Sequence, residues 1–155
     1  MTAPEDLAEA LKASRSALLD AASSVTPERA VLRPADSEWS VLEVLAHLVD
    51  VDYHWVTQAL AMRDNPRHMF VGFDDAAWKQ EHAGIRETPL ADILALLHES
   101  HQAVLYHLAS MSDDDLDAPA LHPRGIPYTV RDVFLRYPAH DENHTRQIEE
   151  ILASI

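Results

Sequence analysis

Cysteine is absent from this chain of 155 residues, and glycine occurs only 3 times. Without cysteine the chain has no disulfide, no thiolate metal site and no thiol nucleophile of its own. Any thiol chemistry would therefore need a thiol supplied by a small molecule. No apolar run approaches the ~20 residues that cross a bilayer. The acidic start MTAPEDLAEALKAS also lacks the basic and apolar regions of a signal peptide. These absences predict a cytoplasmic protein with no membrane partner.

Basic residues are scarce as well. The chain has 12 Lys and Arg against 26 Asp and Glu, which gives a formal net charge of −14. A surface this acidic repels phosphate backbones, so we expect no nucleic-acid partner. Histidine is abundant in contrast, with 10 residues. This number favours metal binding or sensitivity to pH.

Apolar residues recur at helical spacing in four segments of the chain. The first covers residues 5–25. The second begins after Ser40, which forms a capping box with Glu43, and runs to about residue 62. The third is expected to start with Thr88 as its cap and Pro89 in its first turn, and to end near residue 111. The fourth starts at Thr129.

Four amphipathic segments without a strand pattern predict an all-α fold. We expect a four-helix bundle that forms one domain over residues 1–155. The connection over residues 63–88 is long, and a short helix is predicted near residues 74–82. This connection is also apolar, so it is expected to pack on the bundle and to cover a functional site. Its large apolar residues are Met69, Phe70, Val71, Phe73 and Trp78.

Two histidines on the fourth helix are the main candidates for a site. His140 and His144 are in step with the apolar stripe of that helix, and residues four apart lie about 5–6 Å from each other. Buried imidazoles need partners for their nitrogens, and a shared metal would supply one. His47, beside the stripe of the second helix, is the natural third ligand. The alternative interpretation is three core histidines that hydrogen-bond to protein groups.

Other histidines compete for the same role. His98 and His101 form an i,i+3 pair that could donate a ligand, although lining the bundle or facing a partner chain fits them better. His54 lies two turns after His47 and could stand at the mouth of a pocket. The segment HDENH resembles a zinc-protease motif, but Glu142 lies about 200° around the helix from His140, which argues against that chemistry.

Several other side chains have two interpretations each. Asp50 could orient an imidazole from behind, or it could be an ordinary exposed acid. Trp39 could pack at the entrance of the second helix or form a wall of the pocket. Tyr137 could approach a metal or fill the core. Arg136 and Arg124 could hold a substrate carboxylate, or they could pair with acids.

Two motifs resemble those of the DinB-like superfamily. Residues 39–48, WSVLEVLAHL, resemble its W-S-x-x-E-x-L-x-H-L segment, and residues 140–148 resemble its H-x-x-x-H-x-x-Q-I segment. The resemblance implies an up-down-down-up four-helix bundle, commonly a homodimer. It also implies that His47, His140 and His144 bind a divalent metal, often zinc or nickel.

Characterised members of that superfamily include transferases and isomerases that use mycothiol, bacillithiol or glutathione. The resemblance therefore implies activation of such a thiol for transfer to a small electrophile, which suits a chain without cysteine. A metal-dependent hydrolase is the alternative enzyme. A third alternative is a non-catalytic bundle that binds a ligand or a partner. No residue is identified as a general base.

Overall fold

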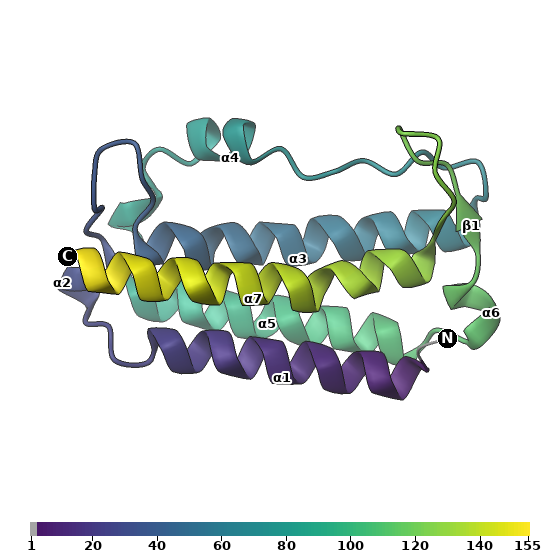
Figure 1. Ribbon diagram of the computed structural model, residues 1–155, viewed down its shortest axis with the longest axis horizontal. Helices are drawn as coiled ribbons and strands as arrows, with labels where there is room; N and C mark the ends of the chain where they lie inside the picture. The colour runs from purple at the N-terminus through teal and green to yellow at the C-terminus, as the bar shows by residue number, and fades with distance from the viewer. Residues whose placement is uncertain (1–2) are drawn as a thin grey trace.

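A computed structural model describes residues 3–155 and shows four long helices side by side (Figure 1). These are α1 (Pro4–Ala22), α3 (Val41–Asp64), α5 (Leu90–Ala109) and α7 (Val130–Ser154). The first and last run in one direction, and the two between them run in the other. This arrangement confirms the predicted up-down-down-up four-helix bundle. Within residues 3–155, no helix combines the length and the apolar character that a membrane span requires.

Short elements occupy the connections. They are α2 (Pro27–Ala30), α4 (Asp75–Glu81), the 3-10 helix η1 (Ile85–Glu87), α6 (Asp113–Leu116), and two strands, β1 (Pro119–Ala120) and β2 (Tyr128–Thr129). The strands pair antiparallel, with Pro119 opposite Thr129. Only α4 was predicted from the sequence. The other elements have two to four residues, which is too short for a periodic pattern to appear.

Two long helices start where predicted, and side-chain caps fix both starts. Ser40 and Glu43 form a capping box at α3, and Thr129 and Asp132 form another at α7. The prediction for α5 was wrong, because Pro89 is itself the cap residue and Thr88 lies outside the helix. The backbone of Pro89 is extended, with ψ 138°, so helical geometry begins one residue later.

The bundle interior consists of two apolar clusters with polar residues between them. One cluster contains Leu11, Trp55, Leu108 and Phe134, and the other contains Leu18, Leu45, Leu97 and Ile148. Each long helix contributes a buried polar residue to one hydrogen-bonded group between the two clusters. These four residues are Arg15, Asp52, Ser100 and Asp141. The core is therefore divided by a polar layer to which every long helix contributes.

The long connection between α3 and α5 follows from their parallel orientation. Because both helices run the same way, the chain must return along the length of α3 before α5 can begin. In Figure 1 this return passes over α3 and places α4 above the first half of that helix. The crossover thus carries residues of the 65–89 segment to the level of His47.

Candidate metal centre

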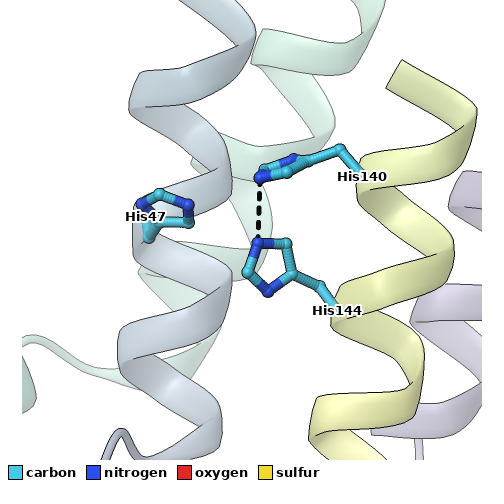
Figure 2. Close-up of side chains that lie close together, drawn as sticks. All are labelled: His47, His140 and His144. Carbon is cyan, nitrogen blue, oxygen red and sulfur yellow. Dashed lines mark hydrogen bonds between the residues drawn. The ribbon is translucent and has the colours of Figure 1, made fainter. Parts of the chain in front are cut away.

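Three histidines from two helices meet inside the bundle (Figure 2). His47 comes from α3, and His140 and His144 come from successive turns of α7. One ring nitrogen from each lies within 4.8 Å of the others. The Nε2 atoms of His140 and His144 are 2.9 Å apart. His47 is 1 % exposed, and the other two are half-buried. Figure 2 shows a ring nitrogen of His47 facing the pair on α7.

Gln147 determines which nitrogen of His144 is available. The Nδ1 atom of His144 lies 2.7 Å from Oε1 of Gln147, one turn further along α7. An amide oxygen can only accept, so Nδ1 carries the proton and donates it to Gln147. The Nε2 atom of His144 then presents a lone pair toward the other two histidines. Gln147 belongs to the second sequence motif, but its spacing alone did not reveal this contact.

Burial keeps the three imidazoles neutral. It lowers the pKa of His47 to about 3, with a smaller contribution from the charge of His144. Burial likewise lowers the pKa of His140 to about 2, helped by His144 and His47. The pKa of His144 is also lowered by burial, against the opposing effect of Gln147. Neutral imidazole is the form that binds a transition metal, so these donors suit one at neutral pH.

His47 provides a further test of whether a metal fits. Within residues 3–155, neither of its ring nitrogens forms a hydrogen bond, and Nδ1 is fully buried. Its Nε2 atom lies 3.6 Å from Oδ1 of Asp75. Burying an imidazole without partners is unfavourable, and a metal held jointly with His140 and His144 would relieve part of that cost. The three nitrogens therefore fit a divalent metal.

Aromatic rings surround the three histidines. Around His47 the ring centroids of Trp39, Phe73 and Trp78 lie 4.9, 5.1 and 5.4 Å away. Trp55 packs against His140 at 4.8 Å. Phe73 and Trp78 belong to the long connection, so that segment does cover the site as expected. These rings restrict access of water from the side of α4.

A cavity of about 630 Å³ opens beside His47 and His144. Its walls come from the connection before α3, from α4 and from the last turns of α7. The lining residues are Pro34, Ser37, Glu38, Trp39, His47, Asp75, His144, Gln147, Glu150, Ile151 and Ser154. Trp39 therefore forms a wall of the pocket, the second of its two interpretations. A small molecule in this cavity would contact His47 and His144 as well as the acidic residues of the wall.

Asp75, which the sequence analysis did not identify, is the carboxylate next to the histidines. It lies in the first turn of α4, lines the cavity, and its side chain is 68 % exposed. Partial burial raises the pKa of this carboxyl above its ordinary value. Asp50, the carboxylate considered from the sequence, instead accepts a hydrogen bond of 2.6 Å from the indole nitrogen of Trp78. It thereby fixes α4 to α3.

The remaining candidates lie away from the histidine group. His54 Nε2 donates to the carbonyl of Val71 at 2.8 Å, which holds the connection in place. Tyr137 donates to the carbonyl of Asp52 and fills the core. Arg136 stacks over the Phe70 ring at 4.7 Å. Arg124 is exposed.

His98 and His101 are not brought to the histidine group either. His98 is exposed, and His101 lines a second cavity, of about 420 Å³, between α1 and α5. Burial, with the nearby charge of Arg15, lowers the pKa of His101 to about 4. Within residues 3–155, His47, His140 and His144 form the one group of three side chains close enough to share a metal.

A buried ion network includes Asp141, the residue that follows His140 on α7. Arg15 donates to both carboxylate oxygens of Asp141 at 2.9 and 3.2 Å, and to both of Asp52 at 3.0 and 2.9 Å. Ser100 donates to Asp52 at 2.6 Å. This network was not predicted from the sequence. The signal for it was present, because Arg15, Asp52 and Asp141 are charged residues in step with apolar stripes.

The chain is similar to known proteins over most of its length. The model of the family described as "DinB superfamily" matches residues 10–148. Among solved structures, YfiT from Bacillus subtilis is 21 % identical, with a TM-score of 0.80 over 96 % of this chain and 85 % of that one. YfiT is described as "a probable metal-dependent hydrolase with an unusual four-helix bundle topology". No sequence among the curated proteins matches.

Two other solved structures share the fold. The mycothiol-dependent maleylpyruvate isomerase is 12 % identical, with a TM-score of 0.76 over 93 % of this chain and 60 % of that one. The colibactin self-resistance protein ClbS, in complex with a double-stranded DNA, is 17 % identical, with a TM-score of 0.73 over 99 % of this chain and 97 % of that one. At these identities the similarity establishes the fold.

The complex of ClbS with DNA corrects one prediction. The net charge of −14 led us to exclude a nucleic-acid partner, and that exclusion was wrong, because a protein of the same fold has been solved with DNA bound. Net charge is a sum over the whole surface, whereas DNA contacts one patch of it. The homodimer expected from the sequence stays a prediction.

Proposed function

Because the chain belongs to the DinB superfamily, we propose that it is a metal-dependent enzyme whose ligands are His47, His140 and His144. The observation that carries this proposal is the meeting of three neutral imidazoles within 4.8 Å beside a cavity of about 630 Å³. Three protein ligands leave a coordination position for water or substrate, which is typical of catalytic rather than structural sites. Zinc and nickel suit this set of nitrogen ligands.

The proposed reaction is transfer of a low-molecular-weight thiol to a small electrophile. A bound zinc or nickel ion would lower the pKa of a thiol, or of a water molecule, and so supply a nucleophile near neutral pH. The chain has no cysteine, so the thiol would come from a co-substrate such as mycothiol, bacillithiol or glutathione. The mycothiol-dependent isomerase of the same fold supports this choice.

The protein's own residues would hold the metal, orient its ligands and shield the site from water. Gln147 keeps the Nε2 lone pair of His144 directed at the centre. Trp39, Phe73 and Trp78 exclude water around His47. Asp75 lies on the cavity side of His47 and is placed to accept a proton from a bound thiol or water. Its distance to His47 Nε2 is 3.6 Å.

A metal-dependent hydrolase is the second candidate, favoured by the description of YfiT. The same histidines would serve, with water in place of the thiol. One observation separates the two enzymes, namely whether a low-molecular-weight thiol is consumed during the reaction. A non-catalytic bundle that binds a ligand is the third candidate, and it would consume neither thiol nor ester substrate.

Metal content tests the proposal first. Protein purified without a histidine tag or added metal is expected to contain about one transition metal per chain, measured by mass spectrometry. The variants His47→Ala and His144→Ala are expected to lose it, because two imidazoles hold a metal far more weakly than three. His98→Ala is the matched control, since His98 is exposed and outside the group, and it should keep its metal. If the wild type contains no metal and takes up neither zinc nor nickel on dialysis, the proposal of a metal-dependent enzyme is refuted.

Gln147 provides a sharper test of the ligand geometry. Gln147→Ala is expected to weaken zinc binding by about 10–100-fold, because the Nδ1 proton of His144 loses its acceptor. Gln147→Glu keeps an acceptor and should stay much closer to the wild type. Competition with a chromophoric zinc chelator measures both affinities. Gln102→Ala, an exposed change on α5, serves as the control. Wild-type affinity in Gln147→Ala would show that the contact does not orient a ligand.

A further inference from the structure

Part of the cavity wall carries negative charge. Glu38 comes from the connection before α3, and Glu150 comes from α7, six residues beyond His144. At 1.5 Å per residue, Glu150 lies about 9 Å along the helix axis from His144. None of the described residues that line the cavity is a lysine or an arginine. This end of the cavity is therefore acidic, at a distance from the candidate metal that a small molecule can span.

The two carboxylates are available to a ligand. Within residues 3–155, neither the Glu38 nor the Glu150 side chain forms a hydrogen bond or an ion pair, and both residues are exposed. The lysine at the rim, Lys79, is already engaged, because its ammonium donates to the carbonyl of Ser37 at 3.0 Å. The ammonium keeps its positive charge, but one lysine stands against three acidic residues of the lining, Glu38, Asp75 and Glu150, so the charge of this wall stays negative.

Apolar side chains line the cavity beside the acidic residues. Trp39 lies between Glu38 and His47 in the sequence, and Ile151 follows Glu150 on α7. The Trp39 indole is half-buried and held by contacts with His47 and Trp78, at 4.9 and 5.4 Å. A fixed indole ring favours flat apolar groups and also attracts cations to its face. At the other end, the buried and unpaired His47 marks where the reacting group would lie.

From this arrangement we propose that the substrate carries a protonated amine, held between Glu38 and Glu150, with apolar surface packed on Trp39 and Ile151. This proposal rests on the proposed function for the position of the reacting end at the histidines. It names the class of substrate that the cavity selects. The same acidic wall disfavours a thiol or an electrophile that carries carboxylates at that end, since like charges within one cavity repel.

A matched pair of probes tests the inference. 2-Phenylethylammonium and 2-phenylethanol share one skeleton and differ in charge, and their dissociation constants can be measured by NMR titration of the full chain. The ammonium is expected to bind about fivefold more tightly or better, from its pairing with two exposed carboxylates. This preference should weaken as the salt concentration rises.

Two double variants test whether Glu38 and Glu150 cause the preference for the ammonium. Glu38→Gln/Glu150→Gln should bring the two dissociation constants to within about twofold of each other. The control Glu142→Gln/Glu149→Gln removes the same two negative charges from exposed positions of α7 that do not line the cavity, and it should keep the preference. Equal binding of the two probes by the wild type, or equal loss of preference in the control, would overturn the inference.

Running the titrations on metal-free and on zinc-loaded protein separates this inference from the proposed function. Uptake of zinc without a preference for the ammonium refutes the substrate class and leaves the metal enzyme standing. A preference located at Glu38 and Glu150 in a protein that takes up no metal supports an amine-binding cavity and refutes the enzyme.

Discussion

Arg15→Met is expected to lower the free energy of unfolding by about 3–5 kcal/mol. The guanidinium is the cation that balances two carboxylates with 1 % and 3 % of their side chains exposed, Asp52 and Asp141. Its removal leaves both without a counter-ion in the polar layer between the two apolar clusters. For a chain of this length, 1 kcal/mol corresponds to about 2–4 °C in Tm. Urea unfolding at pH 7 measures the loss directly.

Two further variants show that the loss comes from unbalanced charge. Lys12→Met lies one turn earlier on α1, where the lysine is exposed and pairs only at the surface with Glu9, at 3.3 Å. It should change the stability by less than about 0.5 kcal/mol. The triple variant Arg15→Met/Asp52→Leu/Asp141→Leu should recover most of the lost stability, because an apolar replacement of a buried ion network is often neutral. An Arg15→Met protein within 1 kcal/mol of the wild type would contradict this account.

Lowering the pH should reduce the stability that Arg15→Met loses relative to the wild type. Burial raises the pKa of the Asp141 carboxyl, and removing the guanidinium, whose charge lowers that pKa, leaves it further above the unfolded value of about 3.9. The folded variant then binds more protons than the unfolded chain, so its stability falls as the pH rises above that value. The difference between wild type and variant is therefore expected to be smaller at pH 5 than at pH 7, in the same urea titrations.

Zinc is expected to raise the Tm of the metal-free protein by about 8–16 °C. A ligand that binds only the folded state adds about 4 kcal/mol to the free energy of unfolding at roughly 1,000 times its dissociation constant. For a chain of this length, each kcal/mol corresponds to about 2–4 °C in Tm. The histidine nitrogens already lie within 4.8 Å of one another, so little binding energy is spent on rearrangement. Differential scanning calorimetry with and without zinc measures the shift.

The variant His140→Ala should reduce this shift to about 2 °C or less, because His140 contributes one of the three nitrogens. His107→Ala, on α5 and outside the group, should retain the full shift. A shift of the same size in His140→Ala and the wild type would mean that zinc stabilises the protein from some other place. The proposal for the three ligands would then be wrong.

The sequence by itself determined the helices and the face on which the histidines lie. Apolar spacing and the capping boxes at Ser40 and Thr129 depend on residues within one or two turns of each other, so local physics fixes them. The same spacing put His140 and His144 on the inward side of α7. The absence of cysteine excluded a protein thiol outright.

Only the tertiary structure decided what surrounds those histidines. Trp78 and Asp75 reach His47 because the crossover between two parallel helices returns over α3, and no local pattern sets where that return falls. Arg15 meets Asp141 across 126 positions of sequence. Such contacts depend on how the helices pack, since a charged residue in an apolar stripe signals a buried partner without naming it. The sequence identified charged residues that need a buried partner, but only the fold determined which residue pairs with which.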